Sequence, residues 1–153
     1  MLSSKAKYGL RALLSLAKEY GQGPMMISTL AQQEAIPKKF LELILLELKR
    51  AGILHSKKGK GGGYLLGKPP TAIRLGQVIR VLDGPLAPIR CVSQTAYQKC
   101  EDCQDERSCG IRLTMKEVRD AIARILDGTT LRDVVRRTEA VRNTAGEALT
   151  YHI

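Results

Sequence analysis

Apolar residues recur at helical spacing along the start of the chain. Over residues 3–20 they form one stripe, kept apart from the lysines and arginines, and Ser3 or Ser4 can cap the start of this helix. The stripe consists of Tyr8, Leu10, Leu13, Leu14 and Ala17. Residues 21–24 contain two glycines and a proline, which predict the end of the helix.

A helix-turn-helix pattern follows. Ser28 is expected to cap a short helix over residues 29–35, and Ile36-Pro37 interrupts the chain before a second helix over residues 37–51. The apolar face of the second helix carries Phe40, Leu41, Ile44, Leu45 and Leu48. Its other face carries Lys38, Lys39, Glu42, Leu46 and Lys49.

A glycine-rich hairpin comes next. Strands are expected over residues 53–56 and 64–66, joined by a loop over residues 57–63. The loop glycines allow positive φ angles and a close approach to another backbone. The loop also carries three lysines, which is typical of a wing beside a helix-turn-helix.

The second half is expected to be helical apart from one long loop. Residues 71–82 predict a helix, residues 86–109 show no periodicity, and residues 111–126 predict a long helix. The long helix has a heptad seam made of Ile111, Met115, Val118, Ile122 and Ile125. A short helix is expected over residues 130–137, followed by a flexible tail over residues 138–153.

These elements predict a mainly α fold with three parts. They are a winged helix-turn-helix domain over residues 1–82 with a two-stranded wing, a cysteine-containing sensor loop over 83–110, and a dimerisation helix with a short C-terminal helix over 111–137. The heptad seam could instead pack inside its own subunit. We favour a homodimer, because one winged helix reads few bases and a two-fold dimer matches a palindromic operator.

Charge divides the chain into two halves. The net charge is +10, and residues 1–80 contain fourteen Lys and Arg against four Asp and Glu, whereas residues 81–153 contain eleven of each. Double-stranded DNA is the simplest partner for a positive surface of this density, although a solvated basic surface is the plainer alternative. No leader segment or membrane span is expected, and the chain is predicted to be cytoplasmic, with no small-molecule substrate.

The residues expected to bind DNA lie on the second helix of the helix-turn-helix and on the wing. They are Lys38, Lys39, Glu42, Lys49, Lys57, Lys58, Lys60 and Tyr64. Lysines can contact phosphates, Glu42 can accept a hydrogen bond from a cytosine amino group, and Lys58 can enter a minor groove. An enzyme is not expected, because the two histidines, His55 and His152, are not placed with a nucleophile.

All four cysteines of the chain, Cys91, Cys100, Cys103 and Cys109, fall in the long loop. Clustered thiols in a cytoplasmic protein favour metal, iron–sulfur or redox chemistry over disulfides. Zinc would find a half-site in Cys100 and Cys103, an iron–sulfur cluster tolerates more varied spacing, and thiol oxidation is a third option. Nearby carboxylates disfavour thiolates, which weakens the case for a free reactive thiol.

Several of these segments resemble the IscR/NsrR/CymR group of bacterial transcription regulators. The likeness covers about residues 1–137 and includes Phe40-Leu41-Glu42, Gly61-Gly62-Gly63-Tyr64 and the pair Cys103 and Cys109. It implies a dimeric winged-helix repressor or activator with a long C-terminal dimer helix. Members with three loop cysteines often hold a [2Fe–2S] or [4Fe–4S] cluster, whereas cluster-free members respond through a partner protein or thiol oxidation.

The sequence departs from this group at the fourth cluster ligand. Arg112 stands where the cluster-assembly regulators have a histidine, and Tyr8 stands where the nitric oxide sensor has an aspartate. The resemblance makes Cys91, Cys103 and Cys109 the expected triad, and we hypothesise that Cys100 is the fourth ligand. The expected function is a sequence-specific regulator, acting as a repressor, that senses iron–sulfur, iron or redox status. A zinc-containing or cluster-free regulator is the alternative.

Overall fold

In the computed structural model, which describes residues 2–150, helix α1 spans Ser4–Lys18. Ser3 caps this helix, because its hydroxyl oxygen accepts a hydrogen bond of 3.0 Å from the backbone N–H of Ala6. The N–H and the hydroxyl of Ser3 also donate to Asp83, the last residue of helix α4 (Leu75–Asp83). One residue therefore both caps α1 and ties it to a later helix.

Helices α2, Ile27–Glu34, and α3, Lys38–Arg50, form the predicted helix-turn-helix. The predicted cap at Ser28 is wrong: α2 begins two residues earlier than predicted, and its N-cap, Met26, makes no side-chain hydrogen bond. Ala35 ends α2 in the left-handed conformation at φ 51°, which costs a residue with a Cβ roughly 1–2 kcal/mol. Burial of the following Ile36 in the core offsets this cost.

Strands β1, Leu54–Lys57, and β2, Gly63–Leu66, form the antiparallel wing, with Leu54 opposite Leu66. Met25 pairs with the other edge of β2, where it exchanges two backbone hydrogen bonds of 2.8 Å with Tyr64. Gly63 permits this approach, because its φ is 147° and a Cβ there would lie 2.2 Å from the Met25 carbonyl oxygen. The chain that enters α2 is thus fixed to the base of the wing.

The helix predicted over residues 71–82 begins later than expected. Pro70–Ala72 forms a short 3₁₀ turn, η1, and α4 starts at Leu75. Between them, Arg74 pairs with Thr130 in an antiparallel bridge. Residues 73 and 74 are extended because they hydrogen-bond to a segment more than fifty residues away, and a local pattern cannot predict such a pairing.

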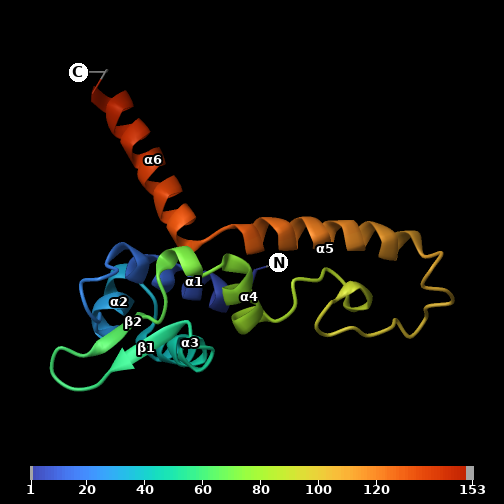
Figure 1. Ribbon diagram of the computed structural model, residues 1–153, viewed down its shortest axis with the longest axis horizontal. Helices are drawn as coiled ribbons and strands as arrows, with labels where there is room; N and C mark the ends of the chain where they lie inside the picture. Colours follow the sequence, from blue (N-terminus) through green and yellow to red (C-terminus); the bar gives the residue numbers. More distant parts are fainter. Residues whose placement is uncertain (1, 151–153) are drawn as a thin grey trace.

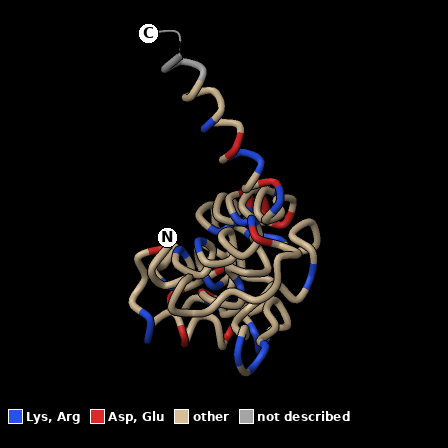
Figure 2. Tube along the Cα trace, turned by 90° about the vertical axis from the view of Figure 1, so that its left-hand side faces the viewer, with Lys and Arg blue, Asp and Glu red and all other residues tan. Residues whose placement is uncertain are grey.

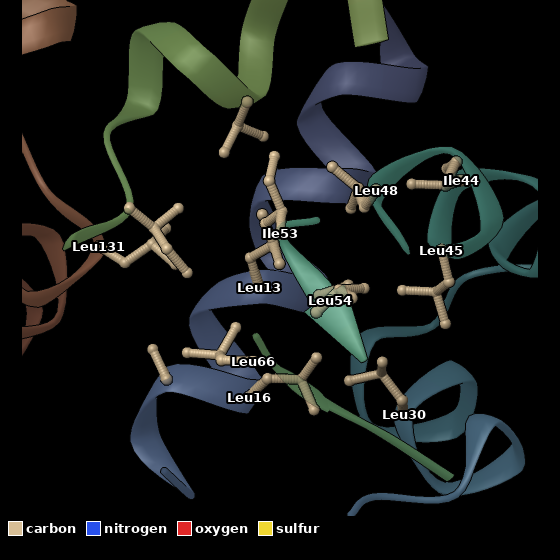
Figure 3. Close-up of a cluster of buried hydrophobic side chains, with 14 of the residues drawn as sticks. Leu13, Leu16, Leu30, Ile44, Leu45, Leu48, Ile53, Leu54, Leu66 and Leu131 are labelled. Carbon is tan, nitrogen blue, oxygen red and sulfur yellow. The ribbon is translucent and has the colours of Figure 1, made fainter. Parts of the chain in front are cut away.

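The core lies between α1, α3, the wing and α4 (Figure 3). Its fully buried side chains are those of Leu13, Leu30, Leu41, Ile44, Leu45, Leu48, Ile53, Leu54, Ile73, Val78 and Leu131. Leu131 comes from the first turn of helix α6, Leu131–Thr150, and Val135 follows it into the same core. The start of α6 therefore belongs to the winged-helix lobe.

Helix α5, Gly110–Gly128, projects to one side of the lobe (Figure 1). None of its residues is buried. The cysteine loop runs from α4 to the far end of α5 and contains a second 3₁₀ turn, η2, at Arg90–Val92 (Figure 1). Helix α5 then leads back to the lobe, where α6 begins.

Helix α6 continues well beyond Arg137, where the sequence pattern placed its end. The small and polar residues that follow are compatible with a helix, since the hydroxyls of Thr138 and Thr144 bond to carbonyls four residues earlier. Of the predicted tail, residues 151–153 lie outside the described part of the chain. Among the described helices, none has the length and apolar character required to cross a bilayer.

Candidate nucleic-acid interface and cysteine loop

Helix α3 presents a polar and basic face away from the core. Its buried side chains, Leu41, Ile44, Leu45 and Leu48, lie against the lobe. Lys38, Lys39, Glu42 and Lys49 are all exposed, as the sequence predicts. Within residues 2–146, none of these four forms an ion pair, so their charges are available to a ligand.

Contacts from α1 hold the helix-turn-helix in place. Glu34, the last residue of α2, accepts hydrogen bonds from the side chains of Arg11 and Ser15. Arg11 also donates to the Glu34 backbone carbonyl, so the α2 end of the turn is fixed twice. On the other side, the Tyr8 ring packs edge-on against Phe40 of α3, with 5.7 Å between ring centroids.

The wing tip carries the three predicted lysines, Lys57, Lys58 and Lys60, all exposed. Gly59 and Gly61, at φ 90° and 74°, give the tip its tight course. Figure 2 shows the wing at the bottom of the molecule, with blue marking its Lys and Arg positions. Tyr64 differs from the lysines: it lies half-buried on β2 against the core, at the base of the wing and not at its tip.

Two leucines on the outer face of α3 are not among the residues that the sequence predicts to bind DNA. Leu43 is 60% exposed and Leu46 is 37% exposed. Both lie on the same face as Lys39 and Arg50, since these four positions follow steps of four, three and four. Their exposure can be predicted from the sequence, because neither leucine falls on the apolar stripe of α3 in a helical projection.

The four cysteines occupy different surroundings. Cys91, in η2, is buried, Cys100 is exposed, and Cys103 and Cys109 are half-buried. Cys109 is the N-cap of α5, where its Sγ accepts a hydrogen bond of 3.4 Å from the Arg112 backbone N–H. A thiol thus begins the long helix at a position where an oxygen side chain is more usual.

The thiols influence one another. A hydrogen bond with Cys91 raises the pKa of Cys100, and the charges of Cys91, Asp102 and Cys109 raise it further. Desolvation raises the pKa of Cys103, with Glu106 adding to the effect and Lys99 opposing it. The raised pKa values disfavour the thiolate forms of Cys100 and Cys103.

The structure does not group the four cysteines as a preformed metal site. Across the described part of the chain, no three Cys, His, Asp or Glu side chains are placed to hold one ion. The donor set has the soft thiolate chemistry of zinc and iron–sulfur sites, but its present arrangement does not fit either. Binding of a metal group would require the cysteine loop to rearrange.

Two arginines of α5 hold the turn that contains Cys91. Arg112 donates from Nε to the Cys91 carbonyl at 3.3 Å, and Arg119 donates to the Val92 carbonyl at 2.6 Å. The two arginines are one heptad apart, so they lie on the same face of α5. Arg112, which stands at the place of a histidine in the cluster-assembly regulators, thus has a structural role here.

The other end of α5 is joined to the DNA-binding lobe. Arg80 of α4 makes two hydrogen bonds to the Asp127 carboxylate, at 2.6 and 2.8 Å. This pairing lowers the pKa of Asp127 and raises that of Arg80. Gly76 lets the helices meet, because a Cβ there would lie 1.9 Å from the Asp127 side chain. Helix α5 therefore links the cysteine loop to the lobe.

The predicted heptad seam lies largely in the open on α5. Ile111 is 69% and Ile125 is 59% exposed, Val118 is also exposed, and Met115 and Ile122 are half-buried. Leu113, on the opposite face of the helix, is exposed as well. A continuous apolar stripe with so little cover in one chain is typical of a surface that binds a partner.

Comparison with known proteins agrees with this architecture. The Rrf2 family profile, described as an iron-dependent transcriptional regulator, matches residues 2–137. An rrf2-like regulator of Rhodobacter capsulatus is 41% identical over 138 residues, which span 88% of this chain and 92% of that protein. CymR of Bacillus subtilis is 36% identical over 138 residues, which span 90% of this chain and 91% of CymR.

Solved structures give the same result. The structure of B. subtilis CymR, titled the global cysteine regulator, superposes with a TM-score of 0.75 and 35% identity over 90% of this chain and 97% of that one. The IscR of T. potens superposes with a TM-score of 0.74 and 27% identity over 92% and 90%. The predicted mainly helical winged-helix fold is confirmed, as is the prediction that the chain is not an enzyme.

Proposed function

Because the chain belongs to the Rrf2 family of transcription regulators, we propose that it is a cytoplasmic, sequence-specific regulator whose cysteine loop controls DNA binding. Repression is the expected mode, since a protein bound over a promoter blocks it directly. The observation that carries the proposal is the shared exposure of the basic α3 face and the lysine-bearing wing tip. Both are fixed to one rigid lobe by the contacts of α1 and Met25.

On DNA, α3 would lie in the major groove and the wing would lie along the adjacent minor groove. Lys38, Lys39 and Lys49 would contact phosphates, and Glu42 would accept a hydrogen bond from a cytosine amino group. Lys58 would enter the minor groove, with Lys57 and Lys60 on the flanking backbone. Tyr64 would act indirectly, by holding the base of the wing against the core.

We propose a homodimer formed through the seam of α5. The exposed stripe from Ile111 to Ile125 supports this arrangement, because two copies would cover each other's apolar side chains. A two-fold dimer would present two α3 helices and two wings to a palindromic operator. Leu113 lies outside the seam and serves as its control position.

The cysteine loop would act on DNA binding through α5. Arg112 and Arg119 connect the Cys91 turn to this helix, and Asp127 connects the same helix to α4 through Arg80. A chemical change at the cysteines that moves the turn would thereby alter how α5 meets the lobe. Coupling of this kind needs only about 1–3 kcal/mol.

An iron–sulfur cluster is the proposed group for the loop. The thiol donor set and the iron-dependent description of the family support it. Cys91, Cys103 and Cys109 would be ligands, with Cys100 as the fourth. Zinc is a less favoured occupant of the same thiols.

A cluster-free regulator is the second candidate. The contact between Cys100 and Cys91, and the lack of a preformed site among the described residues, favour a loop that responds through thiol oxidation or a partner protein. CymR, a relative at 36% identity, is titled a global cysteine regulator.

Two measurements separate these candidates. Anaerobically purified protein should absorb visible light and contain iron and sulfide, and Cys103→Ser should lose all three signals while Cys100→Ser tests the fourth ligand. Colourless protein without iron, sulfide or zinc would leave only the cluster-free candidate. In both cases, selection from a random duplex pool should yield one preferred palindrome. Failure to enrich any sequence would reject the proposed function itself.

A further inference from the structure

The centre of the outward face of α3 is apolar. Leu43 and Leu46 occupy it, with Lys39 one turn before them and Arg50 one turn after. The opposite face, built from Leu41, Ile44, Leu45 and Leu48, is the part of α3 that enters the core. Leu43 and Leu46 are therefore not among the side chains that α3 buries in the core.

Leu43 lies largely in the open, and Leu46 is exposed over about a third of its surface, at 37%. Helix α3 packs against α1, α2, α4 and β1, and the side chains that it buries are Leu41, Ile44, Leu45 and Leu48. Leu43 keeps 60% of its surface in water, which is the highest exposure among the leucines of the described residues. Polar side chains would be tolerated at these exposed helix positions. Two leucines that lie next to each other there indicate contact with a partner.

The charge around the leucines identifies the partner as DNA. Lys38, Lys39, Lys49 and Arg50 surround them, and within residues 2–146 none of these cations pairs with a carboxylate. A protein partner with an apolar surface would leave these four charges unmatched, whereas phosphates on both sides of a groove would match them. The major groove offers one apolar group at base edges, the C5-methyl of thymine.

We propose that Leu43 and Leu46 are specificity determinants that read thymine methyl groups in the operator. This inference rests on the proposed docking of α3 in the major groove. Glu42, adjacent on the same helix, would read a cytosine amino group, so polar and apolar readout would lie side by side. Leu43 is the more exposed of the two and is expected to make the larger contact.

Replacing thymine by uracil removes the methyl group alone and leaves the hydrogen-bonding edge intact. The preferred duplex is first selected from a random pool with the full chain, and each thymine is then replaced in turn by deoxyuridine. Wild-type affinity should fall about fourfold for each methyl group that a leucine contacts, which corresponds to ~0.8 kcal/mol. Replacement of a thymine that α3 does not contact should leave the affinity unchanged.

Leu43→Ala and Leu46→Ala complete the thermodynamic cycle. Each variant should bind the thymine duplex more weakly than wild type. Its affinity should no longer fall when uracil replaces the thymine that the original leucine contacts. Val141→Ala, an exposed apolar position on α6, is the matched control and should behave as wild type. Alanine favours helix and both leucines are exposed, so helical content by circular dichroism should be unchanged.

Three results would overturn the inference. If replacement of thymine by uracil leaves the affinity of the wild-type protein unchanged, no methyl group is contacted. An equal uracil effect in wild type and both leucine variants assigns the contact to another residue. A change of oligomeric state in Leu43→Ala, without any methyl dependence, assigns the leucines to a protein interface. The proposed function fails separately, if the pool yields no preferred sequence at all.

Discussion

Gly63 and Gly76 mark two positions where the chain passes too close to itself for a side chain. Gly63 lies against the Met25 carbonyl, and Gly76 lies against Asp127. The first contact fixes the wing to the entry of α2, and the second lets α4 meet α5. Both contacts join segments that are distant in the sequence, so they could not be predicted from it, although the glycines themselves are plainly visible.

Replacement of Glu42 by alanine should relax base preference with little loss of overall affinity. Its carboxylate is expected to accept one hydrogen bond from a base, and a good base contact contributes about 1–3 kcal/mol of discrimination. Competition binding of the selected duplex against versions changed at each cytosine measures this effect. Glu139→Ala, an exposed carboxylate on α6, is the control. Full discrimination in the Glu42 variant would contradict the assigned contact.

The pair between Arg80 and Asp127 should make stability depend on acid pH. The guanidinium holds the pKa of Asp127 below its ordinary value, so the pair stabilises the fold above pH ~4 and is lost as pH falls through the lowered value. Asp127→Asn should cost up to ~1 kcal/mol near pH 7, since the pair is half-exposed. Its stability should converge with wild type once the pH falls below the lowered pKa of Asp127.

Urea unfolding of wild type and Asp127→Asn at several pH values measures this difference. Asp102→Asn, in the exposed cysteine loop, is the matched control and should follow wild type throughout. A stability difference that stays constant between neutral and acid pH would assign the effect to packing and not to the ion pair.

At the scale of elements, local patterns predicted α1, α3 and the wing well. Leu41, Ile44, Leu45 and Leu48 fall on one face at helical spacing, and they are the residues that the core buries. The start of α4 was misplaced because Arg74 pairs with Thr130, and this pairing depends on the return of the chain through α5. The extension of α6 is not predictable from the local pattern, because small and polar residues at the end of a helix ordinarily indicate a flexible tail.

The Cys91 turn should loosen when Arg119 is removed. The guanidinium donates to the Val92 carbonyl and its side chain is only 13% exposed, so loss of this charged hydrogen bond should cost about 1.5–3 kcal/mol locally. Arg119→Met should therefore speed hydrogen exchange of the Val92 and Ser93 amides by at least about tenfold.

Arg124→Met provides the control for this experiment, because Arg124 is exposed on the same helix. It should leave exchange at residues 90–93 unchanged. Equal exchange rates in wild type and Arg119→Met would mean that the turn is held by other contacts, and the proposed route from the cysteines to α5 would lose its support.

At the scale of the whole molecule, a basic first half is followed by a nearly neutral half that contains the cysteine loop, α5 and α6. The charge division predicts a nucleic-acid site on the basic half, and the heptad seam falls on α5, none of whose residues is buried. The sequence also placed all four cysteines in one loop, but how their thiols group depends on the course of that loop. No spacing rule covers such an irregular segment.

A charge at the centre of the seam should separate two copies. Val118→Lys should convert the proposed dimer to a monomer and weaken binding to a palindromic duplex by at least about tenfold, since avidity from the second half-site is lost. Sedimentation and fluorescence anisotropy measure the two effects. Leu113→Lys, on the opposite face of α5, should change neither. A dimer that survives Val118→Lys would place the interface elsewhere.

The central claim is that the wing and α3 bind DNA through their exposed cations. It is tested most directly by the salt dependence of binding to the selected duplex, compared between wild type and a variant with Lys57, Lys58 and Lys60 changed to alanine. The slope of log affinity against log salt should become shallower by about 0.9 for each phosphate contact removed. An unchanged slope and affinity in the triple variant would contradict the claim.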